Sequence, residues 1–128
     1  MKTIEITLPW PPTVNHYWQR NSNGGMRVSE KGIQYRDAVG KALQDENLNA
    51  GLANHVMVEI EAYMPDKRRR DLDNVLKALL DSLTHGGLWG DDDQVDDLRI
   101  YRARDDAGKL VIGGMVKVRV GTIQAEVA

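Results

Sequence analysis

Three things are missing from this chain of 128 residues: cysteine, a long apolar run and an excess of positive charge. The absence of cysteine excludes disulfides and thiolate metal sites, and it suits a reducing compartment. No stretch approaches the roughly 20 apolar residues that cross a bilayer, and residues 1–8 alternate apolar with polar side chains, unlike a signal peptide. We therefore predict a cytoplasmic protein with no membrane partner.

The formal net charge of -2 argues against a protein that coats nucleic acid by bulk attraction. The two signs are instead separated along the sequence. Residues 67–70 are four consecutive cations, whereas residues 91–97 are mostly aspartate. A charge run is often only a solvated face. Here, however, cations that can hold phosphates stand directly before carboxylates that can hold a divalent metal, which is the composition of a metal-dependent nuclease site.

The spacing of the apolar residues predicts one compact α/β (α+β) domain over residues 1–128, with helices packed on a mixed sheet in the order βαβαββ. Strict alternation predicts strands over residues 4–8, 56–64 and 116–120 and around residues 98–100. Helical spacing predicts helices from Ser29, the expected N-cap, to about residue 47 and over residues 72–85. Residues 9–27, rich in proline, asparagine and glycine, are expected to form a long irregular loop.

The densest group of functional side chains is Lys-Arg-Arg-Arg-Asp-Leu-Asp-Asn at residues 67–74, where a strand gives way to a helix. Asp71 falls at the expected N-cap, and the positive end of the helix would attract its carboxylate or a phosphate oxygen. Asp73 lies on the border of the polar face of the helix. Lys77 is four residues from both Asp73 and Asp81, so ordinary ion pairing on the helix surface is the competing explanation.

A second acidic cluster, Asp91, Asp92 and Asp93, lies in a glycine-flanked loop before the third strand. We expect this loop to fold back onto the start of the preceding helix, although a solvated acidic turn is the simpler explanation. Oxygen-rich ligands favour magnesium or manganese. The histidines lack the spacing of a zinc site, and no phosphate-binding glycine motif or nucleophilic serine motif occurs. No nucleotide cofactor is expected.

Four motifs in order along the chain carry a family resemblance. They are Leu-Pro-Trp-Pro-Pro at residues 8–12, Asn15, R-D-x-D-N at residues 70–74 and D-D-x-Q-V at residues 91–95. Together they resemble the RusA family of Holliday junction resolvases. The resemblance implies a homodimeric, magnesium-dependent endodeoxyribonuclease, with manganese as an alternative metal. Such an enzyme binds four-way junction DNA and resolves it by paired symmetric nicks, in DNA recombination and repair.

The same resemblance assigns roles to individual residues. The catalytic and metal-binding carboxylates would be Asp71, Asp73 and Asp92, with Lys77 as the catalytic lysine and Asp91 as a further candidate ligand. A metal held there would activate water and neutralise charge on the transition state. Cations of the basic run and polar residues of the long loop are the candidates for DNA binding: Lys67, Arg68, Arg69, Arg70, Arg20, Arg27 and Asn15.

Other functions stay open at this point. Trp10, Tyr17 and Trp18 could stack on unpaired bases, but packing within the protein is the more common role for such side chains. A general nuclease would use the same metal chemistry on another DNA geometry. A non-catalytic binder of branched DNA would share the cations and tolerate the loss of Asp73, and a purely structural domain would need neither charge cluster.

Overall fold

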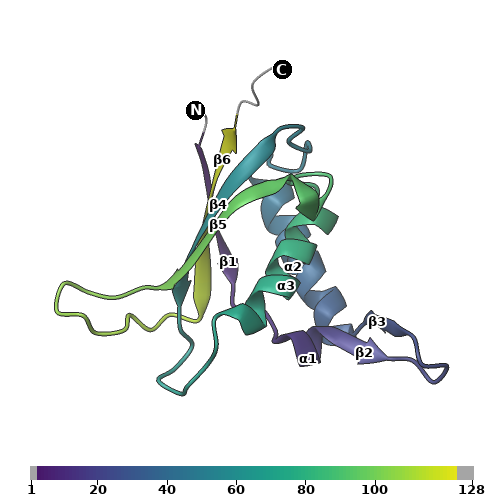
Figure 1. Cartoon of the computed structure of the whole chain (residues 1–128), viewed down its shortest axis with the longest axis horizontal. Helices are drawn as coiled ribbons and strands as arrows, with labels where there is room; N and C mark the ends of the chain where they lie inside the picture. The colour runs from purple at the N-terminus through teal and green to yellow at the C-terminus, as the bar shows by residue number, and fades with distance from the viewer. Residues whose placement is uncertain (1–2, 124–128) are drawn as a thin grey trace.

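A mixed four-stranded sheet with the order β1–β6–β4–β5 forms the centre of the structure, a computed structural model that describes residues 3–123 (Figure 1). Strand β6 (Met115–Ile123) is antiparallel to both of its neighbours, β1 (Thr3–Pro9) and β4 (His55–Tyr63), while β5 (Val95–Arg102) is parallel to β4. Strands β1 and β4 therefore run in the same direction with β6 between them. The predicted mixed sheet is confirmed.

Two helices cover one face of this sheet, α2 (Glu30–Asp45) and α3 (Asp73–His85) (Figure 1). Ser29 is the N-cap of α2 as predicted, since its hydroxyl accepts a hydrogen bond from the backbone N–H of Gly32 at 3.0 Å. The apolar stripe of α3 is buried at Val75, Leu79 and Leu83, and the two leucines pack in one core with the inward side chains of the strands. This packing fixes where the first turn of α3 lies relative to the sheet.

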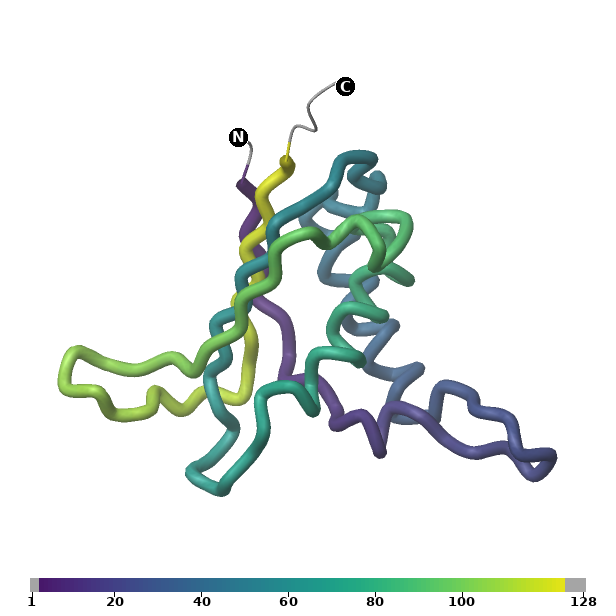
Figure 2. Tube along the Cα trace, viewed as in Figure 1, coloured from purple at the N-terminus to yellow at the C-terminus, as the bar shows by residue number. Residues whose placement is uncertain are grey.

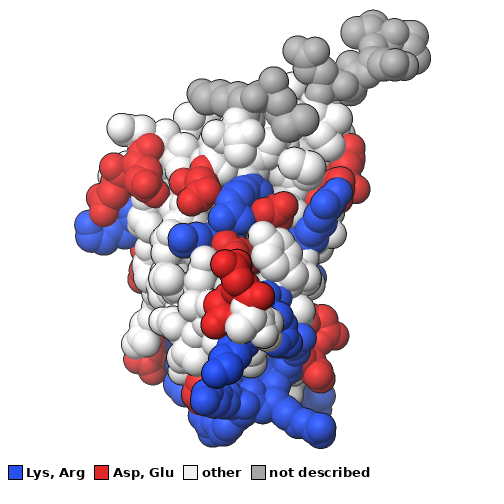
Figure 3. Space-filling model, turned by 90° about the vertical axis from the view of Figure 1, so that its left-hand side faces the viewer, with Lys and Arg blue, Asp and Glu red and all other residues white. Residues whose placement is uncertain are grey.

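The opposite face of the sheet is polar, and Figure 3 looks at the side of the molecule that carries it. Arg119 on β6 forms ion pairs with glutamates of both neighbouring strands: Glu5 at 3.0 Å, Glu59 at 2.9 Å and Glu61 at 3.0 Å. Alternation along the strands thus separates a core face from a charged face.

The segment predicted as an irregular loop is more ordered than expected, so that prediction is wrong in part. Residues 9–27 include helix α1 (Val14–Tyr17) and strand β2 (Trp18–Arg20), which pairs antiparallel with β3 (Met26–Val28). Elements of three or four residues are too short to reveal a period in the sequence. Tyr17 is fully buried, which confirms packing as its role.

No helix within residues 3–123 combines the length and apolar character needed to span a membrane.

Candidate functional site

Three segments project at the end of the molecule where α3 begins (Figure 2). They are the β2–β3 hairpin, the connection from β4 to α3 over residues 64–72, and the connection from β5 to β6 over residues 103–114. Lys and Arg side chains gather at this lower end in Figure 3. The basic run, residues 67–70, and the adjacent Asp71 and Asp73 therefore share one end of the fold with the hairpin.

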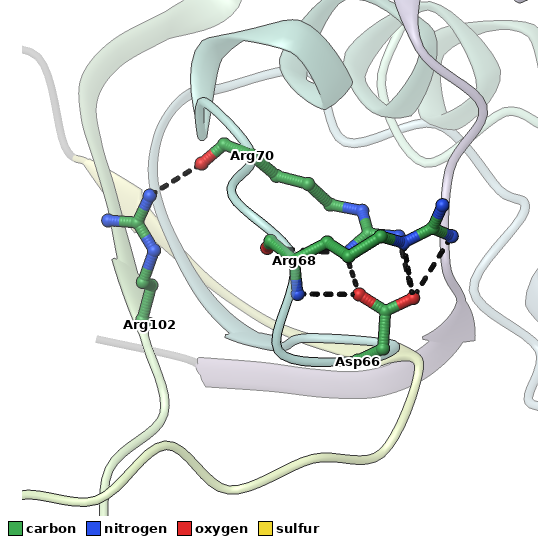
Figure 4. A network of polar contacts seen from close by, with 4 residues as sticks. All are labelled: Asp66, Arg68, Arg70 and Arg102. Carbon is green, nitrogen blue, oxygen red and sulfur yellow. Dashed lines mark hydrogen bonds and ion pairs between the residues drawn. The ribbon is translucent and has the colours of Figure 1, made fainter.

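Asp66 organises the basic run (Figure 4). Its carboxylate accepts hydrogen bonds from the backbone N–H of Arg68 at 2.9 Å, from Arg68 Nε at 3.1 Å and from Arg70 Nη2 at 3.0 Å. The hydrogen bonds from Arg70, followed by those from Arg68, hold the pKa of Asp66 well below its usual value. Arg68 and Arg70 are thus oriented by Asp66, whereas Lys67 and Arg69 are exposed and form no ion pair within residues 3–123.

Two further cations, from the end of β5, lie beside the basic run. Arg102 donates from Nη2 to the backbone carbonyl of Arg70 at 2.6 Å (Figure 4). Arg102 and Arg104 line a hollow of about 400 Å³ together with the basic run and Asp71. Neither arginine was predicted from the sequence. Their spacing of two at the end of β5 was the available signal, because alternate strand residues share a face.

Asp71 does not cap α3, so the prediction of an N-cap at this position is wrong. The helix begins at Asp73, Leu72 stands at the cap with helical dihedral angles, and no side chain caps the helix. Within residues 3–123, Asp71 contributes only its backbone carbonyl, which accepts from the N–H of Asn74 at 3.3 Å. No side-chain partner in that range engages its exposed carboxylate, which lies between the cations and the start of α3.

The residue before α1 lies close to this point, while the two loop arginines lie on the hairpin. Thr13, the residue before α1, lines a hollow of about 360 Å³ with Arg69, Asp71 and Asn74. Asn15 is exposed on α1, two residues later. Arg20 on β2 and Arg27 on β3 are exposed on the hairpin.

Lys77 forms no ion pair with Asp73 or Asp81 in the part of the chain that the structure describes. Ordinary ion pairing on the helix surface therefore does not account for it. Asp81 is instead paired with Arg36 of α2, at 2.8 Å. Asp73 and Lys77 are exposed, lie one turn apart on α3, and have no ion pair or side-chain hydrogen bond within residues 3–123. A carboxylate and an ammonium group are therefore available on one helical turn beside Asp71.

Asp81 belongs to a structural network that joins the helices. Tyr17 donates its hydroxyl hydrogen to Asp81, and Arg36 Nε donates to the Tyr17 oxygen at 2.8 Å and to Asp81 at 3.1 Å. Burial alone would raise the pKa of Asp81, but the hydrogen bonds from Tyr17 and Arg36 outweigh it, and this pKa lies below its usual value. The network fixes α1 against α2 and α3.

We expect Asp81→Asn to lower the free energy of unfolding by about 2 kcal/mol at neutral pH, because a charge-assisted hydrogen-bond network is lost. The folded-state pKa of Asp81 is depressed. Its stabilisation is therefore complete above the unfolded pKa of about 4 and disappears as the pH falls through the folded pKa. Urea unfolding of both proteins across this range measures the difference.

Asp45→Asn is the matched control for Asp81→Asn. Asp45 pairs with Lys41 at 3.0 Å, but their side chains are 61% and 74% exposed, so the loss should be only about 0.4 kcal/mol. Equal losses of unfolding free energy in the two variants would contradict the role given to Asp81. So would a difference in stability between the native protein and Asp81→Asn that persists at acidic pH.

Two side chains of the D-D-x-Q-V loop, Asp91 and Gln94, hold the loop in its conformation. Asp91 caps the short 3-10 helix η1 (Asp92–Gln94), since its carboxylate accepts from the N–H of Asp93 at 2.9 Å. Gln94 accepts from the N–H of Asp91 at 3.1 Å and donates to the carbonyls of Leu52 at 2.7 Å and Asn54 at 2.9 Å. One oxygen of Asp91, the further candidate ligand, is therefore engaged in capping.

Asp92 lies at the far end of α3, so the expectation that its loop folds back onto the start of the helix is wrong. Thr84 accepts a hydrogen bond from Nε1 of the buried Trp89 at 2.6 Å and donates to Asp92. Thr84 is eleven residues after Asp73 on the same helix, which corresponds to roughly 16 Å at about 1.5 Å per residue. Within residues 3–123 no three carboxylate or histidine side chains converge on a single cation position.

A family model and several known proteins match the part of the chain that carries these motifs. A family model described as endodeoxyribonuclease RusA matches residues 9–113. The crossover junction endodeoxyribonuclease RusA of Escherichia coli (strain K12) is 49% identical over 102 residues, which cover 80% of this chain and 84% of that protein. Proteins of the same name from Enterobacteria phage 82 and Shigella sonnei are 48% identical over the same shares. The chain belongs to the RusA family of endodeoxyribonucleases.

Proposed function

We propose that this chain is a structure-specific endonuclease that resolves four-way (Holliday) junctions by paired symmetric nicks, in DNA recombination and repair. The observation that carries the proposal is the group of Asp71, Asp73 and Lys77, three charged side chains without partners among the described residues, beside a cluster of cations. The names of the bacterial and phage relatives give the same substrate. We also propose a cytoplasmic location, with the DNA, and no nucleotide cofactor.

The carboxylates at the start of α3 suit magnesium, with manganese as an alternative. Magnesium is commonly held by one or two carboxylates together with water and substrate phosphates, and Asp71 and Asp73 are exposed hard-oxygen donors beside a phosphate-binding surface. When bound, such a metal supplies Lewis acidity and charge neutralisation for phosphodiester hydrolysis. Asp71 and Asp73 would hold it.

The remaining side chains position the DNA and stabilise charge. Lys77, one turn after Asp73, would bind the scissile phosphate and oppose the negative charge that develops during hydrolysis. Lys67 and Arg69, the unpaired members of the basic run within residues 3–123, would hold neighbouring phosphates. Contacts of this kind fix the position of the backbone without reading base sequence, which suits an enzyme that recognises a branched shape.

We further propose a homodimer in which the partner subunit's Asp92 completes the carboxylate set. The carboxylate of Asp92 in the same chain is held by Thr84, roughly 16 Å along α3 from Asp73. A two-fold arrangement that places the end of one α3 near the start of the other would give two equivalent sites. Two equivalent sites on a two-fold junction would produce paired cuts.

Cleavage of an end-labelled synthetic four-way junction and of a linear duplex with the same sequence tests this function. Each substrate is incubated with the protein in magnesium and in a chelator. We expect paired nicks in opposite strands of the junction, in magnesium only, with the duplex intact. Equal cutting of the duplex would instead identify a general nuclease, and binding without any cut would identify a junction-binding protein.

A further inference from the structure

The β2–β3 hairpin is a basic arm that stands away from the body of the protein (Figures 1 and 2). Residues 18–28 contain Arg20 and Arg27 and no acidic residue. Both arginines are exposed, and neither forms an ion pair within residues 3–123. None of the residues proposed for cleavage lies on this arm. Its charge therefore calls for an anionic partner outside the site.

The strand register places the two arginines on opposite faces of the arm. Arg20 pairs with Met26, and Gln19 pairs with Arg27. Paired residues of antiparallel strands share a face, and consecutive residues of a strand alternate between faces. Arg20 and Arg27 are thus one step apart in the ladder and point to different sides. An arm that lay flat on a phosphate backbone would use cations on one face only.

The base of the arm is held firmly in place. The Trp18 ring packs edge-on against Tyr17 with ring centroids 5.3 Å apart, and the N–H of Ser29 donates to the Tyr17 carbonyl at 2.8 Å. A Cβ on Gly32 would lie 2.7 Å from that same carbonyl, so the first turn of α2 presses closely on the arm. Tyr17 is itself fixed by Arg36. The arm is therefore oriented before any partner binds, which lowers the entropic cost of binding.

We propose that this arm lies in a groove of one duplex arm of the DNA junction, with Arg20 on the phosphates of one groove wall and Arg27 on those of the other. The major groove, about 12 Å wide, admits a two-stranded ribbon and has phosphates along both walls. Cations on both faces of a ribbon match that environment. The inference rests on the proposed junction-binding function, and it adds a contact to the duplex beyond the crossover.

Binding and footprinting in a chelator, where no cleavage occurs, test the arm. The double variant Arg20→Ala/Arg27→Ala is compared with the native protein and with Lys41→Ala, which removes an exposed cation of α2. We expect the double variant to lower the slope of log affinity against log salt by about 2. It should also lose hydroxyl-radical protection in one groove of the duplex arms while keeping protection at the crossover. Lys41→Ala should match the native protein.

A footprint and a salt slope identical to those of the native protein would overturn the proposal. A change from dimer to monomer in analytical ultracentrifugation would also overturn it, because the arm would then bind a second copy of the chain. Magnesium-dependent junction cleavage by the native protein is measured in parallel. Its presence with an unchanged footprint would reject the arm alone, whereas its absence would reject the proposed function.

Discussion

Asp73→Asn is expected to reduce junction cleavage by about a thousandfold or more while leaving junction binding intact. Asp73 is exposed and has no partner among the described residues, so its replacement removes no contact that stabilises the fold. Asparagine keeps the shape but lacks the charge needed to hold a divalent cation. Loss of the several kcal/mol that a metal contributes to the transition state corresponds to about three powers of ten in rate.

Binding should be preserved or strengthened in Asp73→Asn, because a negative charge is removed from a surface that meets phosphates. Gel-shift titration and single-turnover cleavage of the same labelled junction separate the two effects. Asp106→Asn is the matched control, with the same change of charge at an exposed residue in the β5–β6 connection. Cleavage by Asp73→Asn at the native rate would disprove the metal site.

Asp92→Asn is expected to cause a loss of the same size, even though Thr84, which binds Asp92, lies roughly 16 Å along α3 from Asp73 in the same chain. The asparagine oxygen can still accept the hydrogen bond from Thr84, so the loop should keep its conformation. The neighbouring Asp93 is an exposed carboxylate in the same loop, and only its backbone N–H contributes to the cap. Asp93→Asn should therefore cleave the junction normally, and equal losses in both variants would indicate a general effect of loop charge.

The long elements were predictable because each repeats its period many times. Strand β4 alternates buried and partly exposed residues over all nine of its positions, and α3 shows its apolar stripe over 13 residues. The arm could not be predicted in this way, since β2 and β3 have three residues each. Their pairing depends on a turn closed by the N–H of Asn21 on the carbonyl of Gly25, at 2.7 Å.

The types of residue in the candidate site were predictable, but their positions were not. The capping of η1 by Asp91 is a local signature that sequence spacing carries. The attachment of Asp92 to Thr84 depends on how Trp89 packs into the core. The approach of Arg102 to the carbonyl of Arg70 depends on the register of β5. Contacts of this kind arise from tertiary packing, which the periodicity of the sequence does not reveal.

The most direct test of a shared metal site is junction cleavage by a heterodimer of the two inactive variants. Asp73→Asn and Asp92→Asn chains carrying different affinity tags are expressed together, and the mixed dimer is purified on both tags in turn. If each site takes Asp73 from one subunit and Asp92 from the other, one site of the mixed dimer carries both changes and the other carries neither.

We predict that this heterodimer regains magnesium-dependent nicking of the labelled four-way junction, with one strand cut per dimer, while each variant alone stays inactive. A heterodimer that binds the junction but cuts neither strand would contradict the account. That result is expected if each site takes Asp73 and Asp92 from the same subunit, because each site would then carry one of the two substitutions.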